Sequence, residues 1–227
     1  MLTASAGLVG LVVGVLLWVL VERVPARHAV LTRPFPEVAG AFREPLGLAV
    51  VIVTGALWAG VAQRLGDVWE LPAFLLLAAA LVALSAIDLR HFILPNRIVF
   101  PLAVATLLLL GGAAAAEGDA DAFLRALACS AGGLFAFMIL HLASPRAMGF
   151  GDVKLSFVLG LALGWLGVGE AVLGLFLGFV YGAVVGMFLI ATKLRSRKDH
   201  VPFGPFLAAG AMTAVLVGDV IVDWYRG

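Results

Sequence analysis

The sequence predicts an all-α membrane protein with about eight transmembrane helices. Its 227 residues are 63% hydrophobic and only 13% charged, and their mean hydropathy is +1.12. In a soluble domain apolar residues make up about half of the chain, so this composition excludes a water-soluble fold. The apolar residues also gather in runs of about 20, the length that an α-helix needs to cross the hydrocarbon core.

Eight such runs follow one another, and we interpret residues 1–227 as a single transmembrane domain. No basic segment precedes the first run, so we expect a retained helix and not a cleaved signal. Only Gly164-Trp-Leu-Gly-Val-Gly and Glu170 separate the sixth run from the seventh, and a turn is required there because a helix of about 40 residues would exceed the bilayer. The expected spans are 2–21, 46–63, 71–88, 98–116, 123–143, 153–168, 170–192 and 203–223.

The connection 22–45 is the longest, and its four prolines (Pro25, Pro34, Pro36 and Pro45) exclude one regular helix. It is also too short to build a core of its own. The single cysteine, Cys129, lies in an apolar run, which excludes a disulfide framework and a cysteine-based metal site. We expect no metal centre, since the histidines are scattered along the chain at His28, His91, His141 and His200.

The basic residues predict the orientation, because cytoplasmic loops are enriched in Lys and Arg. Twelve of the 15 Lys and Arg residues fall in odd-numbered loops, which places those loops in the cytoplasm and both the N- and C-termini outside. The formal net charge of +1 gives no indication of nucleic-acid binding. The twelve residues are Arg23, Arg27, Arg33, Arg43, Arg90, Arg97, Arg146, Lys154, Lys193, Arg195, Arg197 and Lys198.

Two aspartates stand at the predicted cytoplasmic boundary: Asp88 closes the third run and Asp152 opens the sixth. An ionisable group costs roughly 2.5–3.5 kcal/mol at a helix centre in a membrane, so it is a candidate for function. Two neighbouring carboxylates cannot both ionise readily. One can then take a proton from water while the other polarises or protonates an amide carbonyl. The alternative is that each acid caps a helix end, or that Arg90 and His91 pair with Asp88.

Glycines surround the second acid in Gly149-Phe150-Gly151-Asp152. A glycine permits a close approach that a Cβ atom would block, which suits a site where an extended substrate backbone must reach a carboxylate. Lys154 is two residues from Asp152 and so lies off its helix face. We expect Lys154 either to tune the site or to contact lipid phosphate.

A second glycine pattern is structural. Glycines recur every fourth residue along the seventh span, and small residues at this spacing let membrane helices approach closely. The pattern predicts a packing seam within the chain or a homodimer contact. The four positions are Gly174, Gly178, Gly182 and Gly186.

Four segments carry a resemblance to a known family. Gly149-Phe-Gly-Asp-Val-Lys-Leu, followed by Gly160 and Gly164-Trp, resembles the Gly-x-Gly-Asp motif of the type IV prepilin peptidases. Ile87-Asp-Leu-Arg-His-Phe-Ile-Leu-Pro-Asn is similar to the segment of that family that holds its first catalytic aspartate. Pro202-Phe-Gly-Pro-Phe-Leu-Ala resembles the entry to its last helix, and Val21-Glu-Arg-Val-Pro resembles the end of its first helix.

The resemblance implies a membrane aspartic protease of the Gly-x-Gly-Asp type in the cell inner (cytoplasmic) membrane, with Asp88 and Asp152 as the catalytic pair. Such enzymes remove the basic leader of prepilins and pseudopilins at the cytoplasmic face. The acidic residues Glu22, Glu37, Glu44 and Asp199 either attract that leader or are ordinary solvated charges.

Long members of the family carry a zinc-binding domain with two Cys-x-x-Cys pairs after the first span, and they methylate the new N-terminus with S-adenosylmethionine. Here the loop 22–45 stands in place of that domain and has no cysteine. We therefore expect no cofactor for proteolysis, and S-adenosylmethionine only where methyltransferase activity persists.

Two alternatives remain open at this point. The first is a related protease that cuts preflagellins or a peptide inside the membrane. The second is a transporter in which the two acids relay protons or bind a cation; such sites lie near the bilayer midplane on discontinuous helices.

Overall fold

The computed structural model describes residues 2–25, 37–145, 148–194 and 201–227. In these ranges the chain forms nine α-helices and no strand, which confirms the predicted all-α class. It divides into two compact units, Met1–Ala120 and Asp121–Gly227. Positions named in the sequence analysis that lie outside the described residues are Arg27, His28, Arg33, Pro34, Pro36, Arg146, Arg195, Arg197, Lys198, Asp199 and His200.

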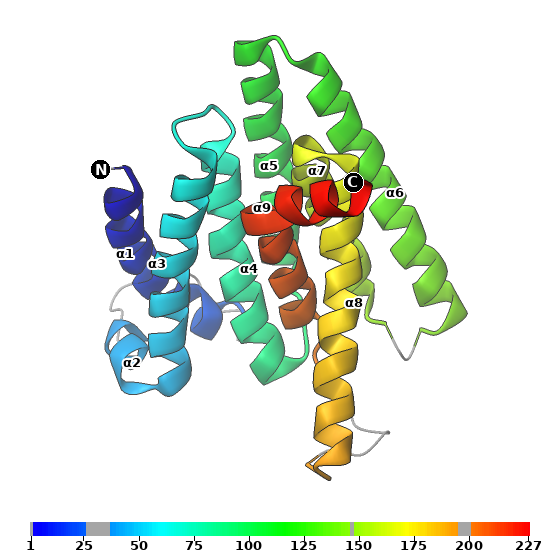
Figure 1. Ribbon diagram of the computed structural model, residues 1–227. Coiled ribbons are helices and arrows are strands. Elements are labelled where there is room, and N and C mark those ends of the chain that lie inside the picture. Colours follow the sequence, from blue (N-terminus) through cyan, green and yellow to red (C-terminus); the bar gives the residue numbers. More distant parts are fainter. Residues whose placement is uncertain (1, 26–36, 146–147, 195–200) are drawn as a thin grey trace. The chain divides into compact units, whose positions relative to one another are not determined.

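The first unit holds five helices: α1 Leu2–Arg23, α2 Glu37–Arg43, α3 Pro45–Leu65, α4 Leu71–His91 and α5 Asn96–Glu117 (Figure 1). The backbones of α1 and α3 are in contact. A Cβ atom added to Gly14 would lie 2.7 Å from the Cα atom of Val51, and one added to Gly10 would lie 3.0 Å from the Cα atom of Gly55. Small residues allow this approach between membrane helices, whose association depends on close van der Waals packing.

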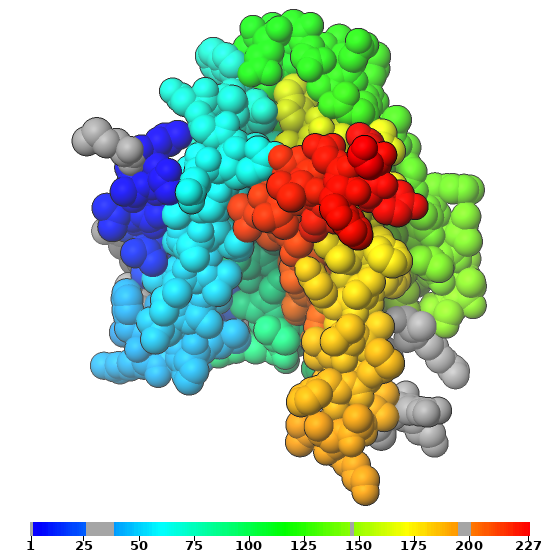
Figure 2. Space-filling model, in the orientation of Figure 1, coloured from blue at the N-terminus to red at the C-terminus, as the bar shows by residue number. Residues whose placement is uncertain are grey.

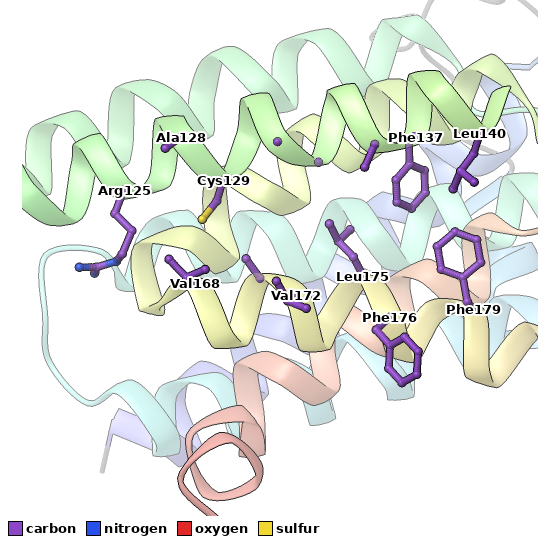
Figure 3. A pocket seen from close by; sticks show the side chains of 14 residues that line it. Arg125, Ala128, Cys129, Phe137, Leu140, Val168, Val172, Leu175, Phe176 and Phe179 are labelled. Atoms are coloured by element: carbon purple, nitrogen blue, oxygen red, sulfur yellow. The ribbon is translucent and has the colours of Figure 1, made fainter. Parts of the chain in front are cut away.

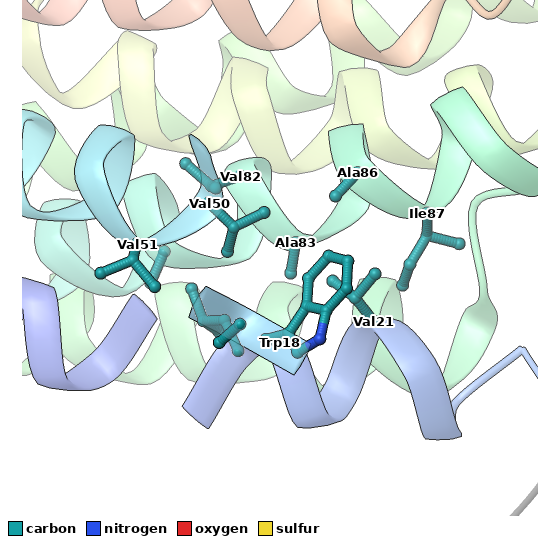
Figure 4. Packing of buried hydrophobic residues seen from close by; sticks show 11 residues of the cluster. Trp18, Val21, Val50, Val51, Val82, Ala83, Ala86 and Ile87 are labelled. Atoms are coloured by element: carbon teal, nitrogen blue, oxygen red, sulfur yellow. The ribbon is translucent and has the colours of Figure 1, made fainter. Parts of the chain in front are cut away.

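Helix α4 is the central helix of this unit, since 14 of its 21 residues are buried. It packs against α1, α3 and α5. Figure 4 shows its contribution to a core cluster in which Trp18 and Val21 of α1 lie beside Ala83 and Ile87 of α4. Because the cluster extends to Ile87, the residue that follows it, Asp88, comes directly after the core.

The second unit holds four helices: α6 Ala120–Ala143, α7 Phe150–Leu166, α8 Val168–Ala191 and α9 Gly204–Arg226. Helix α7 is central here, with 12 of its 17 residues buried. It packs on α6 through glycines. A Cβ atom on Gly160 would lie 2.5 Å from the carbonyl oxygen of Cys129, and one on Gly164 would lie 2.5 Å from the Cβ atom of Cys129. Cys129 is therefore a small residue at a helix contact.

The glycine seam predicted on α8 is confirmed at Gly174 and Gly178, and a Cβ atom on Gly182 would lie 3.5 Å from the ring of Phe206 in α9. Gly174 and Gly178 face α9, where a Cβ atom on Gly210 would lie 2.4 Å from the carbonyl oxygen of Gly174 and 2.5 Å from the nitrogen of Gly178. A Cβ atom on Gly186 would meet nothing within 4 Å. The seam thus joins α8 to α9 within one unit, and the homodimer contact stays a prediction.

Seven of the described helices are long and apolar enough to cross a membrane, all except α2 and α7. Helix α7 matches the sixth expected span, but its 17 residues extend only about 26 Å, less than the hydrocarbon core of about 30 Å. The turn predicted after it is confirmed, since α7 ends at Leu166 and α8 begins at Val168. The chain is therefore a multi-pass membrane protein.

The surface is consistent with lipid as the surrounding solvent. Figure 2 shows that no other helix covers the C-terminal half of α8 on the visible face. Its apolar side chains at Val184, Met187 and Phe188 are each more than half exposed. Soluble monomers rarely expose contiguous apolar patches of large size, whereas in a bilayer such side chains lie among acyl chains.

Candidate functional site

Asp88 lies in the last turn of α4, and its side chain is only 6% exposed. The helix ends at Phe92, whose backbone N–H donates a hydrogen bond of 2.9 Å to the carbonyl oxygen of Asp88. Phe92 adopts the left-handed region, with φ 54° and ψ 38°, a conformation usually taken by glycine at helix ends. The chain therefore changes direction immediately after the turn that carries the acid.

Arg90 connects the end of α4 to α1 and to the start of α3. Its guanidinium forms ion pairs with Glu22, near the end of α1, and with Glu44, the residue before α3. The same guanidinium lies 4.6 Å from the ring centroid of Trp18, within the range of a cation–π contact. The turn that holds Asp88 is thus tied to both α1 and the start of α3.

These contacts revise the sequence-based view of the acidic residues. Glu22 and Glu44 were expected to attract a basic leader or to be solvated, but both carboxylates bind Arg90. Two carboxylates and one guanidinium leave the group with a net charge of −1. No spacing rule predicts these pairs, since Glu22 and Glu44 precede Arg90 by 68 and 46 residues. The side chain of Glu37 and the whole of Asp199 lie outside what the structure describes.

Asp152 lies in the first turn of α7, and its side chain is 7% exposed. Its backbone N–H donates a hydrogen bond of 3.1 Å to the carbonyl oxygen of Gly149, the residue that caps the helix. Gly151 lies within the same first turn. The acid is therefore enclosed at the start of a helix, where the backbone N–H groups and the helix dipole favour negative charge.

Space beside the carboxylate, and not backbone conformation, accounts for Gly149. Its φ of −67° and ψ of 145° are accessible to any residue. A Cβ atom at this position, however, would lie 3.2 Å from Oδ2 of Asp152, closer than ordinary van der Waals contact between these atoms. Glycine at position 149 thus leaves room next to the carboxylate, and the approach of a substrate backbone to this space stays a prediction.

The other motif residues form a small group beside this turn. Nζ of Lys154 lies 4.7 Å from the ring centroid of Phe150, and the ring of His141 lies 5.5 Å from the same centroid. Nδ1 of His141 lies 2.8 Å from the carbonyl oxygen of Met148; since a carbonyl only accepts, the imidazole donates. His141 therefore joins the end of α6 to the entry of α7, a role that sequence spacing did not indicate.

A zinc site does not fit the described part of the chain. No group of three or more His, Cys, Asp or Glu side chains among the described residues is arranged to hold a metal ion. Cys129, the single cysteine of the sequence, lies at the helix contact between α6 and α7.

Each acid is thus buried at one end of the central helix of its own unit, Asp88 in the first and Asp152 in the second. A carboxylate in such a place can accept, hold or donate a proton with limited competition from water. That the two carboxylates meet in one site stays a prediction.

Comparisons with known proteins agree with these features. The profile of the type IV leader peptidase family matches residues 75–190, just over half of the chain, a range that includes Asp88 and Asp152. The prepilin leader peptidase/N-methyltransferase of Aeromonas hydrophila is 37% identical over 183 residues, which are 78% of this chain and 60% of that protein. Proteins of the same name from Burkholderia pseudomallei (37% identical) and Pseudomonas aeruginosa (32% identical) also match 78% of this chain, and 57% and 60% of their own lengths.

The chain spans about 60% of the length of the curated relatives it matches. No solved structure matches it. The family profile covers the end of α4 and the start of α7, where the two buried acids lie. The chain therefore belongs to the type IV leader peptidase family.

Proposed function

We propose that this membrane protein is an aspartic endopeptidase that removes the leader peptide of prepilins or pseudopilins, with Asp88 and Asp152 as its catalytic pair. One observation carries the proposal: each unit buries one carboxylate in a terminal turn of its central helix, within the region that the family profile matches. Asp88 is 6% exposed and Asp152 is 7% exposed. Burying an ionisable group is costly, and two such groups in one family-specific region favour acid–base chemistry over a purely structural role.

The reaction needs two carboxylates that share one proton. The ionised carboxylate takes a proton from water as the water oxygen bonds to the scissile carbonyl carbon, and the protonated carboxyl donates its proton to the carbonyl oxygen. In the second step the carboxyl that took the proton from water donates it to the amide nitrogen, the other carboxylate accepts a proton from a hydroxyl of the tetrahedral intermediate, and the carbon–nitrogen bond breaks. The amine and the carboxylic acid leave, and the pair again holds one proton.

The positions of the two acids on their helices suggest which one activates water and which one polarises the carbonyl. The dipole of a helix favours negative charge at its start and positive charge at its end. Asp152 lies at the start of α7 and Asp88 at the end of α4. We therefore assign the activation of water to Asp152 and the polarisation of the scissile carbonyl to Asp88.

The same proposal includes an orientation in the inner (cytoplasmic) membrane. The excess of Lys and Arg in the odd-numbered loops favours a cytoplasmic position for both acids. A basic leader would then stay in the cytoplasm while the apolar helix of the substrate enters from the bilayer. The relatives' name also includes an N-methyltransferase, and S-adenosylmethionine would be the methyl donor for such a step here.

The test is cleavage of a co-expressed prepilin by Asp88→Asn and Asp152→Asn variants of the full chain. Acid–base catalysis contributes roughly 10²–10⁴-fold, so we expect each variant to lose cleavage by at least about 100-fold at normal protein level. Asp67→Asn and Asp223→Asn serve as matched controls, since both of these aspartates are exposed. Normal processing by either Asp88→Asn or Asp152→Asn would overturn the assignment.

The mass of the mature pilin N-terminus, produced with this protein as the sole peptidase, gives the cleavage site and reveals any added methyl group. A transporter would instead move protons or cations into proteoliposomes without cleaving prepilin. Its acids are expected near the middle of discontinuous helices, whereas Asp88 and Asp152 lie in the terminal turns of theirs.

A further inference from the structure

An apolar groove of about 570 Å³ runs between α6 and α8 in the second unit. Figure 3 shows Val172 and Leu175 of α8 on one side of it, opposite α6. Phe137 and Phe179, whose ring centroids are 5.4 Å apart, lie toward the end remote from Arg125. Sites that hold small molecules have volumes of about 300–1,000 Å³, so the groove is large enough for a ligand.

The groove is open because α6 presents small residues to it. Ala128, Gly132 and Ala136 recur every fourth residue among the groove-lining residues and so share one face of the helix. A Cβ atom on Gly132 would meet nothing within 4 Å, whereas one on its neighbour Gly133 would lie 3.0 Å from the carbonyl oxygen of Ser156 in α7. One flank of α6 is thus packed on α7 while the adjacent flank leaves space beside α8.

Arg125 lies at one end of the groove (Figure 3). Its Nε donates to the carbonyl oxygen of Gly164 at 2.9 Å, and its Nη2 donates to that of Trp165 at 2.6 Å. These acceptors at the end of α7 are uncharged, and no carboxylate of the described residues forms an ion pair with Arg125. The two bonds hold the guanidinium in place, and its Nη1 group can donate to a further acceptor.

The position of Arg125 along α6 suits a lipid headgroup. It is five residues after the start of the helix, about 7.5 Å along its axis. An arginine at this depth near a helix end can extend to the membrane interface, where lipid phosphates lie. The Nη1 group of Arg125 can donate a charge-assisted hydrogen bond to a phosphate oxygen.

The described residues that line the groove are almost all apolar, with Arg125 as the one cation among them. A transmembrane helix with its side chains is about 10–12 Å wide. A single acyl chain is narrow enough to enter. An apolar groove that ends at an arginine with no ion pair to a carboxylate of the described residues matches an amphiphile with an apolar tail and an anionic head.

We propose that the groove between α6 and α8 binds one acyl chain of an anionic phospholipid whose phosphate is held by Arg125. Neither acid lines the groove, and lipid binding there does not require peptidase activity. A lipid bound in the groove would differ from the bulk lipids in two ways: its phosphate would contact Arg125, and its acyl chain would contact the apolar side chains that line the groove.

The experiment is native mass spectrometry of the full-length protein in detergent, titrated with phosphatidylglycerol or phosphatidylcholine. We expect one phosphatidylglycerol per chain, bound more tightly than phosphatidylcholine. Loss of a charged hydrogen bond should weaken binding of phosphatidylglycerol by about tenfold or more in Arg125→Gln and affect phosphatidylcholine less. Gly132→Leu should weaken both lipids by about tenfold, since its side chain enters the groove without meeting a neighbour at Cβ.

Gly112→Leu is the matched control, because a Cβ atom on Gly112 of α5 also meets nothing within 4 Å; it should bind both lipids like the unmodified protein. Asp88→Asn should do the same, which separates this proposal from the peptidase assignment. Unchanged phosphatidylglycerol binding in Arg125→Gln and Gly132→Leu would overturn the lipid site. So would a Gly132→Leu variant that loses only self-association or only prepilin binding, since the groove would then belong to a second copy or to the substrate.

Discussion

The two acids are carried by matching helices but held in opposite ways. Asp88 lies in the last turn of the central helix of the first unit, and ion pairs of Arg90 with Glu22 and Glu44 connect this turn to other elements. Asp152 begins the central helix of the second unit, where a glycine leaves room beside the carboxylate. The comparison teaches that a buried acid can be positioned by an ionic network or by close packing. Loss of charge should disturb the turn that holds Asp88 most, and added volume should disturb the turn that holds Asp152 most.

The largest expected effect on stability is Gly210→Ala. Its Cβ atom would lie 2.4 Å from a backbone oxygen of α8, so α8 and α9 must separate. We expect a loss of about 2–3 kcal/mol in the free energy of unfolding, measured by denaturation in detergent. Gly186→Ala on α8 is the control, since its Cβ atom meets nothing within 4 Å. We expect it to raise the free energy of unfolding by about 0.5–1 kcal/mol. Equal stability of the two variants would contradict the role of close packing in this unit.

A smaller loss is expected for Arg90→Gln, about 1–2 kcal/mol, from two partly exposed ion pairs and one cation–π contact. Because salt screens exposed charges, the difference from the unmodified protein should shrink at high ionic strength. Lys193→Gln, at the exposed end of α8, removes the same charge as a control. If both variants lose the same stability, the ionic network does not hold the end of α4.

Gly149→Ala should affect catalysis and leave stability nearly unchanged. The added Cβ atom would press on Oδ2 of Asp152 from 3.2 Å, and the carboxylate must shift by a few tenths of an ångström. Misplacement of a catalytic group by about 1 Å can cost 100-fold, so we expect turnover of prepilin to fall by about tenfold with KM little changed. Gly112→Ala is the control. Normal turnover by Gly149→Ala would show that the space beside Asp152 is not needed.

The smallest expected effect is that of His141→Phe, which keeps an aromatic ring near Phe150 but removes the hydrogen bond to the carbonyl of Met148. We expect a loss of about 0.5–1.5 kcal/mol, measured by denaturation in detergent. Arg90 and His141 share no described partner, so combined with Arg90→Gln the two losses should add if the turns act independently. Strong non-additivity would show that the two acid-bearing turns are coupled.

Hydropathy and small motifs predicted much of this molecule. The turn between α7 and α8 and the packing of Gly174 and Gly178 against a neighbouring helix both agree with the sequence analysis. Helix α7 begins at Phe150, three residues before the expected span 153–168, and the short helix α2 was not foreseen. Neither was the role of His141, which resembles any other interfacial histidine in the sequence.

The helices could be predicted and the side-chain partners could not, because the two depend on interactions of different range along the chain. Within a bilayer the backbone can satisfy its polar groups only by forming helices or closed barrels, so apolar runs and the acids at their ends can be read directly from the chain. Side-chain partners depend on how those helices pack. Arg90 meets glutamates 46 and 68 residues earlier, and Arg125 meets carbonyls 39 and 40 residues later. No local pattern encodes such pairs, because they arise only when the helices pack against one another.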